Sequence, residues 1–208
     1  MRLRSRVAVL TAALVALSFL AFTGPALAQC DPDNVIFEDD FEFFDASWGT
    51  PSDTVYVEDG ALIIKEGWGQ VNFSTRVDEA DVCIDITIVE PDQGDVDISP
   101  ASIIFWWQDW DNYYEMLYWA TGGYAVDRIR KGKATRVVEY RETDALKQGL
   151  GQTNSFQLRL RPKDATLFIN GDEQVRFKGQ APKEGGVIGF RSWGLSKFDN
   201  FFVSELIE

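Results

Sequence analysis

The sequence predicts an all-β domain built as a sandwich of two antiparallel sheets. Runs rich in β-branched and aromatic residues recur at spacings of about ten residues, the spacing that all-β sandwiches show. Clusters of Gly, Asn and Asp separate these runs and mark turns. The chain has no amphipathic pattern long enough to predict a helix. These observations favour a β-sandwich over any helical or mixed fold.

Residues 1–28 have the pattern of a signal peptide. Three Arg residues precede an apolar run at Val7–Phe22, and the small residues of Pro25–Ala28 follow as a cleavage site. A retained membrane anchor is the less favoured alternative, because no basic stop-transfer flank follows the apolar run. We therefore expect an exported protein, periplasmic or extracellular, with residues 29–34 as a short tail and residues 35–208 as one β-sandwich domain.

The charge balance limits the classes of partner. Loss of the three Arg in the first 28 residues leaves 17 basic side chains against 33 acidic ones, a net charge of −16. Such a balance argues against nucleic acid, and against an anionic membrane surface once the signal peptide is cleaved. The chain has no His, which excludes His-based triads and His metal sites. No cofactor is expected, and the oligomeric state is not predicted.

The chain has two cysteines, Cys30 and Cys83, and an exported protein matures in an oxidising compartment. We expect them to form a disulfide that ties the tail to an early strand. Closing a loop of about 50 residues would contribute roughly 4 kcal/mol in the chain-entropy model. The alternative is one buried and one exposed thiol.

The centre of the predicted sandwich is the stretch Ala101–Arg130, which holds four of the seven Trp and four of the six Tyr. Runs at Ser102–Gln108, Tyr113–Trp119 and Tyr124–Arg130 are separated by two turns, which predicts a three-stranded antiparallel meander. The first two runs are apolar on both faces, as in strands at the middle of a packed sheet.

The remaining strands are predicted on both sides of this meander. Arg141–Thr153 is polar, and one helical turn is possible there. In chain order, the strands are expected at Val35–Phe37, Thr54–Val57, Ala61–Lys65, Gln70–Arg76, Asp81–Val89, Thr135–Tyr140, Ser155–Arg161, Ala165–Ile169, Gln174–Phe177, Gly186–Arg191 and Phe198–Ser204.

The order of short motifs along the chain resembles the concanavalin A-like lectin/glucanase jelly roll. Within that superfamily the chain is most similar to the LamG-like and 3-keto-disaccharide hydrolase (domain of unknown function 1080) groups. The resemblance implies two stacked sheets, with the meander in a concave sheet and the first and last strands paired. It rests on Glu38–Phe41, Val57–Leu62, Ile104–Phe105, Asp111–Tyr114, Leu167–Gly171, Gly186–Phe190 and Phe198–Phe201.

The resemblance also bears on catalysis. Glucanases of this fold carry two Glu in a Glu-x-Asp-x-Glu-like run on one strand. The nearest run here is Cys83–Ile88, in which Cys83 and Thr87 stand where the two Glu would be. In the pattern of the 3-keto-disaccharide hydrolases, Trp107 replaces an Arg, Tyr114-Glu115 is kept, and Leu117 replaces a Gln. Catalytic residues are therefore not assigned.

Aromatic rings and planar polar groups together form typical saccharide sites, because rings stack on sugar C–H faces and polar groups bind hydroxyls. The same rings are also what a sandwich core requires, and that alternative stays open for most of them. Trp110 lies in a turn between two Asp and is expected at the rim of a site, and Tyr114 is the candidate that could instead face the core. The candidate carbohydrate-binding residues are Trp110, Tyr114, Glu115, Arg128, Arg130 and Trp193.

Two charged segments each allow two interpretations. Arg128 and Arg130 share one face of a predicted hairpin and could bind an acidic sugar, or they could protect a sheet edge from aggregation. Asp92, Asp95 and Asp97 lie in one loop and could hold calcium, but a solvated acidic loop is favoured and no metal site is assigned.

The function that the sequence favours is an exported, lectin-like module that binds an oligo- or polysaccharide without catalysis. One alternative is a glycoside-processing enzyme related to the 3-keto-disaccharide hydrolases. The other is a structural or protein-interaction sandwich of the cell envelope. The identity of the saccharide is not predicted.

Overall fold

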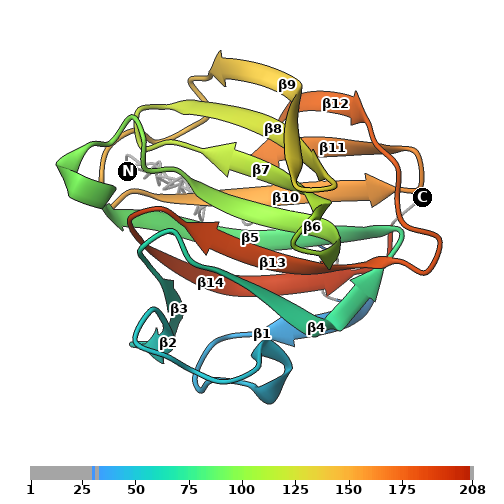
Figure 1. The fold of residues 1–208 in the computed structure, drawn as a ribbon, viewed down its shortest axis with the longest axis horizontal. Coiled ribbons are helices and arrows are strands. Elements are labelled where there is room, and N and C mark those ends of the chain that lie inside the picture. Colours follow the sequence, from blue (N-terminus) through green and yellow to red (C-terminus); the bar gives the residue numbers. More distant parts are fainter. Residues whose placement is uncertain (1–29, 31–32, 207–208) are drawn as a thin grey trace, which may run out of the picture.

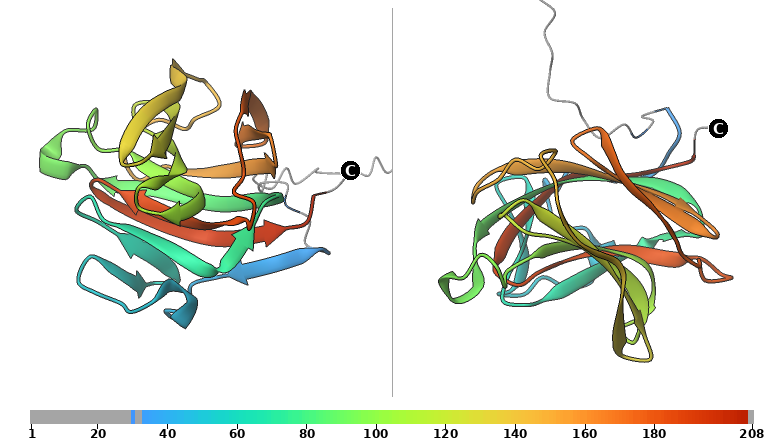
Figure 2. Two further views of the ribbon diagram at one scale, coloured as in Figure 1. Left: turned by 45° about the vertical axis from the view of Figure 1, so that its right-hand side comes forward. Right: turned by 90° about the horizontal axis from the view of Figure 1, so that it is seen from above.

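The computed structural model describes residue 30 and residues 33–206. Within this range the chain forms two antiparallel sheets that stack face to face, as Figure 1 shows from the front and Figure 2 from two other sides. The predicted signal peptide, residues 1–28, lies outside the described residues. Among the described residues, no helix is long and apolar enough to cross a bilayer.

The front sheet in Figure 1 has six strands in the order β4-β13-β6-β7-β8-β9. The meander forms its centre, close to the predicted boundaries, and its first two strands lie inside the sheet. The strands are β4 (Gly69–Val77), β6 (Ala101–Asp109), β7 (Asn112–Tyr118), β8 (Gly123–Arg130), β9 (Lys133–Glu142) and β13 (Gly186–Ser192).

The second sheet has eight strands, seven of them in the order β12-β11-β10-β5-β14-β3-β2, with β1 paired to β14. The expected pairing of the first and last strands is thereby confirmed. The strands are β1 (Val35–Asp39), β2 (Val55–Glu58), β3 (Ala61–Ile64), β5 (Ala80–Glu90), β10 (Thr153–Arg161), β11 (Asp164–Ile169), β12 (Asp172–Lys178) and β14 (Leu195–Ser204).

Two short 3-10 turns complete the described elements, η1 at Ala46–Trp48 and η2 at Asp92–Gly94. The helical turn considered for Arg141–Thr153 is wrong, since the segment after β9 consists of turns and bends. The side chain of Asn154 explains this: it accepts from the backbone N–H of Lys147 and donates to the carbonyl of the same residue. These two bonds hold Lys147 in a loop instead of a helical ladder.

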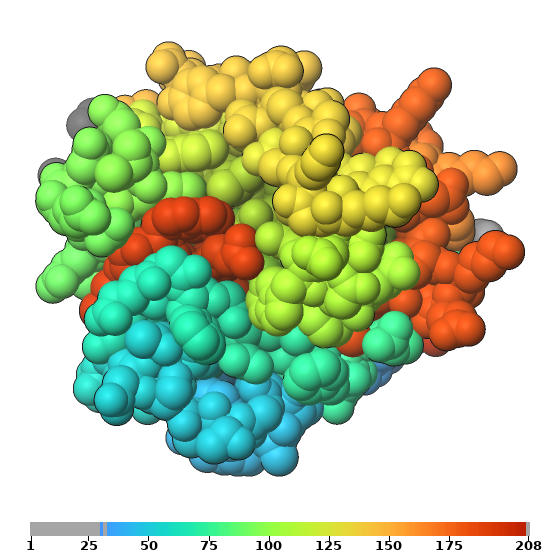
Figure 3. Space-filling model, in the orientation of Figure 1, coloured from blue at the N-terminus to red at the C-terminus, as the bar shows by residue number. Residues whose placement is uncertain are grey.

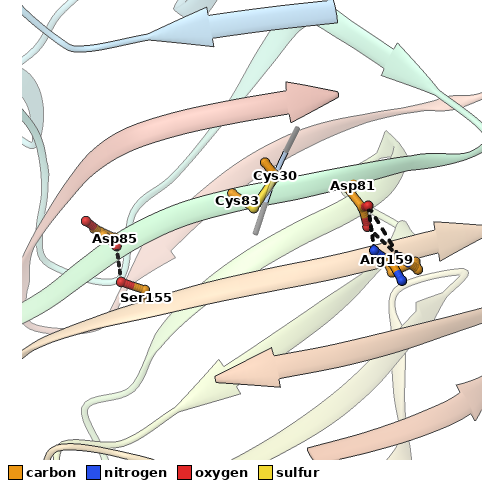
Figure 4. Close-up of a disulfide and its surroundings, with 6 residues drawn as sticks. All are labelled: Cys30, Asp81, Cys83, Asp85, Ser155 and Arg159. Atoms are coloured by element: carbon orange, nitrogen blue, oxygen red, sulfur yellow. Dashed lines mark hydrogen bonds and ion pairs between the residues drawn. A yellow bond between two sulfur atoms is a disulfide. The ribbon is translucent and has the colours of Figure 1, made fainter. Parts of the chain in front are cut away.

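The core lies between the sheets and is filled by side chains at alternate positions of each strand. On β5, Val82, Ile84 and Ile86 face the core, so Asp81 and Cys83 face outward, as does Asp85. Cys30 and Cys83 form the expected disulfide on this outer face (Figure 4). On either side of it, Asp81 pairs with Arg159 of β10 at 3.0 Å, and Asp85 accepts from Ser155.

An irregularity in β6 is important for the site. The pairing of β6 with β7 shifts after Phe105, and Trp106 has a φ of 50°. Phe105 and Trp106 are consecutive, yet both side chains lie in the core. A β-bulge has this effect, because the extra residue changes the side to which the following residue points. Trp107 therefore lies on the outer face of the sheet.

Candidate functional site

The outer face of the six-stranded sheet carries polar and aromatic side chains at the positions that alternate with the core. On β7, Tyr114, Met116 and Tyr118 belong to the core, and Tyr113 packs on the outer side with residues of the neighbouring strands. Glu115 has the same orientation as Tyr113, two residues away. Figure 3 shows this face, where the red end of β13 lies between the teal β4 region and the yellow-green β6–β7 turn.

Arg191 of β13 is at the centre of this face. β13 lies between β4 and β6, and Arg191 is paired with Gly69 on one side and with Ser102 on the other. Its Nη1 donates to the Tyr113 hydroxyl at 3.1 Å and to Glu115 Oε1 at 3.4 Å. These contacts from β7, two strands away, fix the guanidinium against the sheet.

Three aromatic rings surround this guanidinium. The centroids of Trp110, Tyr113 and Trp193 lie 5.4, 5.7 and 5.3 Å from Arg191 Cζ, within the range of cation–π attraction. Trp107 extends the group, with its ring 5.6 Å from that of Trp110 in an edge-to-face arrangement. We call Arg191, Trp107, Trp110, Tyr113 and Trp193 the arginine–aromatic cluster. Trp110 is 45% exposed, so the cluster opens to solvent on its side.

Gly69 of β4 allows the cluster to lie close to the sheet. A Cβ at this position would lie 3.0 Å from Trp110 Cη2 and 3.1 Å from Arg191 Nε. Both side chains therefore occupy space that any other residue at position 69 would partly fill. Glycine is typical of positions where another group approaches the backbone this closely.

Two buried donors of the cluster have no hydrogen-bond partner among the described residues, Trp107 Nε1 and Arg191 Nε. Buried polar groups without a partner are uncommon in folded proteins and carry a free-energy cost. Both belong to side chains that contact the Trp110 ring. The cluster therefore offers more donors than the protein itself uses.

Glu115 lies next to the cluster and is only 4% exposed. Ser102 Oγ donates to its Oε1 at 2.7 Å. Burial raises the pKa of the Glu115 carboxyl, and the charges of Arg191 and the Ser102 hydrogen bond oppose that rise. Asp127 of β8 is paired with Glu115 across the strands and raises the pKa of Glu115 further. Asp127 is held by Arg136 of β9 at 2.6 Å.

The structure divides the six predicted site residues into two groups. Trp110, Glu115 and Trp193 are brought together around Arg191 on the outer face. Tyr114 points the other way, toward the core, where its ring stacks on Phe105 with centroids 5.4 Å apart. Arg128 and Arg130 accompany Tyr114: Arg128 lies 5.3 Å from its ring centroid, and both arginines line a pocket with it.

Arg191, Tyr113 and Trp107 are not among the six candidate residues predicted from the sequence. Arg191 comes two residues before Trp193, which was selected, but no local pattern indicates that β13 pairs between β4 and β6. Tyr113 and Tyr114 are consecutive residues of one strand, so their side chains point to opposite faces of the sheet. Once the strand is recognised in the sequence, a core position for Tyr114 implies an outer position for Tyr113. Trp107 would face the core by simple alternation from Phe105, and the bulge at Trp106 reverses this.

The carboxylates considered for catalysis are also distributed differently from the sequence pattern. Cys83–Ile88 belongs to β5 of the eight-stranded sheet, behind the meander, so it is not a strand of the cluster's sheet. Two carboxylates that do lie on the face of the cluster, Glu115 and Asp127, come from adjacent strands. A search for a motif within one strand does not detect such a pair.

The acidic loop at Asp92–Asp97 is held by its own backbone and by Ser99. Asp95 Oδ1 accepts from the backbone N–H of Asp97, and Ser99 Oγ donates to the carbonyl of Asp95 at 2.6 Å. Among the described residues, no group of three or more His, Cys, Asp or Glu side chains is arranged as a metal site.

Comparison with known proteins supports the fold. No family model matches the sequence, and no curated protein matches it. Among solved structures, a β-glucanase from Bacillus licheniformis is similar with a TM-score of 0.60 and 9% identity, over 82% of this chain and 98% of that one. The catalytic domain of an endo-1,3-β-glucanase (laminarinase) from Thermotoga petrophila has a TM-score of 0.59 and 10% identity, over 84% and 98%.

A carbohydrate-binding module from Bacillus subtilis is similar with a TM-score of 0.53 and 13% identity, over 75% of this chain and 90% of that one. The solved structures that resemble this chain have the concanavalin A-like jelly-roll fold. The chain has that fold as well: two stacked antiparallel sheets with the first and last strands paired. At these identities the similarity establishes the fold alone.

Proposed function

We propose that the outer face of the six-stranded sheet binds a saccharide and that the protein is an exported, lectin-like module without catalysis. One observation carries this proposal: a single guanidinium, that of Arg191, is surrounded by three aromatic rings within 5.7 Å. Aromatic faces stack on the C–H faces of sugars, and a planar guanidinium binds hydroxyl oxygens with directed N–H groups.

The surroundings of the cluster fit an extended ligand. Trp68, in the loop before β4, is 52% exposed, and Phe73 on β4 is 58% exposed. The Phe73 ring lies 6.2 Å from that of Trp107, which continues the apolar surface along the sheet. Exposed aromatic side chains gathered on one face are more common at binding sites than elsewhere on a soluble protein. An oligo- or polysaccharide is the ligand class that this shape favours.

The two nearby carboxylates support binding over catalysis. Glu115 is buried and accepts from Ser102 and Arg191, and Asp127 is held by two hydrogen bonds from Arg136. A glycosidase needs a nucleophile or base directed at the sugar ring and an acid at the glycosidic oxygen. Both carboxylates are instead directed at neighbouring side chains, so we assign them the role of fixing arginines.

One observation favours the alternative of a glycoside-processing enzyme related to the 3-keto-disaccharide hydrolases. Glu115 belongs to the Tyr114-Glu115 pair, and its raised pKa beside the ion-paired Asp127 resembles the division of roles between an acid and a base. Release of reducing sugar, abolished in Glu115→Gln, would establish that function. Binding without release would support the lectin-like one.

A structural or interaction role within the cell envelope is the third possibility, and the exposed Trp68 and Phe73 are compatible with it. A glycan array distinguishes it from saccharide binding. Export, to the periplasm or beyond, is part of the proposal; it is supported by the Cys30–Cys83 disulfide, because such bonds persist in oxidising compartments.

The test compares saccharide affinity, measured by calorimetry, in the wild type and in two variants of the cluster. Trp110→Ala removes one stacking ring, and Arg191→Lys keeps the charge beside Glu115 but removes the planar fork. We expect affinities between about micromolar and millimolar for the wild type and a severalfold loss in each variant. Phe43→Ala is the matched control, since that ring is 69% exposed and lies in a pocket beside β1 and β14.

The melting temperature of Trp110→Ala separates a binding role from a structural one. An exposed turn residue supports little of the core, so we expect its removal to change the melting temperature slightly. If Trp110→Ala lowers the melting temperature by many degrees, or binds saccharide as the wild type does, the cluster is not the site.

A further inference from the structure

A second pocket lies at the end of the sandwich, at the base of the β6–β7 turn. It has a volume of about 230 Å³ and is lined by residues at the ends of β7 and β8, by Trp106 and Gln108 of β6, and by Gln180 from the segment after β12. Tyr114, Arg128 and Arg130 contribute to its wall. Of the arginine–aromatic cluster, Tyr113 also lines this pocket, whereas Trp110 and Arg191 do not.

The two arginines reach the pocket because of the alternation of β8. Tyr124 and Val126 of this strand face the core, and Arg128 and Arg130 continue the same side toward the end of the sandwich. Arg128 is paired with Tyr114 across the strands, and its guanidinium lies 5.3 Å from the Tyr114 ring centroid. Beyond Val126 the core-facing row of β8 therefore changes from apolar to cationic.

These charges are not neutralised by the protein. The chain has 33 acidic residues and 20 basic ones, yet neither Arg128 nor Arg130 forms an ion pair with any described residue. By contrast, Arg136 on the adjacent strand β9 is paired with Asp127. Both unpaired guanidinium charges act on the Tyr114 hydroxyl, where they oppose the rise in its pKa that burial causes.

We propose that this end pocket binds the oxyanion of an acidic saccharide, a uronate carboxylate or a sulfate ester, between Arg128 and Arg130. A guanidinium binds such groups with two parallel N–H bonds. The Arg128 guanidinium lies 5.3 Å from the Tyr114 ring centroid, within the range of cation–π attraction that would hold it in the pocket. The pocket and the arginine–aromatic cluster lie near the same turn and share Tyr113. The inference rests on the proposed function for the identity of the molecule that carries the oxyanion.

The test compares oligogalacturonate with its methyl-esterified form by calorimetry, because esterification removes the charge and keeps the sugar chain. We expect the wild type to prefer the free acid by about tenfold or more, with a preference that weakens as salt is added. The double variant Arg128→Gln/Arg130→Gln should lose this preference. The double variant Lys131→Gln/Lys133→Gln removes the same charge from the adjacent exposed turn and should keep it. A sulfated galactan and its desulfated form, tested in the same way, distinguish sulfate from carboxylate.

Two outcomes would overturn the inference. One is equal affinity of the wild type for the charged and uncharged forms of both saccharides. The other is an equal loss of preference in the arginine and lysine variants. Such a result would indicate nonspecific electrostatic attraction by the positive charges of the hairpin, without a defined binding site. The proposed function fails separately: it fails if Trp110→Ala and Arg191→Lys leave the affinity for the esterified saccharide unchanged. Circular dichroism and the melting temperature of each double variant verify that it is folded.

Discussion

Glu115 shows how one buried carboxylate can organise a surface. It accepts from Ser102 and Arg191 through the same oxygen, Oε1, and it lies beside Asp127 in the register of β7 and β8. Its pKa is raised because burial disfavours the charge more than Arg191 and Ser102 favour it. An ionised Glu115 therefore fixes the guanidinium of the cluster at a cost in folding free energy.

That cost predicts a pH dependence of stability. A carboxyl whose pKa is raised on folding binds protons more tightly in the folded state, so its contribution is present below the unfolded pKa and is lost as the pH rises through the folded pKa. We expect the free energy of unfolding of the wild type, relative to Glu115→Gln, to fall as the pH rises above the ordinary pKa of a Glu carboxyl, about 4. Urea denaturation at a series of pH values measures this difference.

Ser102→Ala supplies a second measurement on the same carboxyl. The Ser102 hydrogen bond lowers the pKa of Glu115, so its loss should move the fall in stability to higher pH. A difference between wild type and Glu115→Gln that is the same at every pH would contradict this account.

Residue-level sequence reasoning had a definite limit at this site. The exposure of Trp110 and the core orientation of Tyr114 could both be predicted, the first from its turn and the second from alternation with Met116 and Tyr118. The role of Arg191 could not, because its neighbours Trp110 and Tyr113 are brought to it by strand pairing between distant segments. Whether these residues bind saccharide stays a prediction.

At the scale of elements, the bulge in β6 determines which rings are available to a ligand. It places both Phe105 and Trp106 in the core and turns Trp107 to the outer face. Close packing accompanies it: a Cβ on Gly186 of β13 would lie 2.4 Å from the backbone of Trp106. Bulges re-aim side chains near functional sites in this way. The positions of the strands followed from hydrophobic patterning, but the bulge did not, since no Gly marks it in β6.

Two glycine variants test this arrangement, one where the added methyl group would meet backbone and one where it would meet side chains. Gly186→Ala places a methyl group against backbone that cannot move without disrupting the pairing of β13 with β6, and we expect a loss of about 1–3 kcal/mol in the free energy of unfolding. Gly69→Ala places one 3.0 Å from the tip of Trp110, a half-exposed ring that can shift. We expect it to be less destabilising and to weaken saccharide binding. Equal stability losses, with binding unchanged in Gly69→Ala, would contradict the account.

At the scale of the whole molecule, the two outer faces carry different features. The face of the six-stranded sheet carries the arginine–aromatic cluster, and the face of the eight-stranded sheet carries the Cys30–Cys83 disulfide on β5. The core between the sheets separates them. The fold class, the positions of the strands and the disulfide can be predicted, because each depends on local pattern or on there being only two cysteines. The residues that meet on the outer face of the six-stranded sheet come from five strands, of which β4 and β13 are distant in sequence from the meander, so local sequence patterns do not predict which side chains lie together there.

This separation predicts that the disulfide supports stability and leaves binding unaffected. The bond joins residues 53 apart in sequence, so the chain-entropy model gives a loss of about 4 kcal/mol when it is removed. We expect Cys30→Ser to lower the urea midpoint accordingly, and dithiothreitol to lower that of the wild type by a similar amount. Saccharide affinity at low denaturant should be the same in the oxidised, reduced and variant proteins, because Arg191 and its rings lie on the opposite sheet.

Two free thiols per chain, counted in denatured protein purified from the export compartment, would show that the bond does not form there. A loss of affinity on reduction, in protein that is still folded, would show instead that the two faces are coupled through the core.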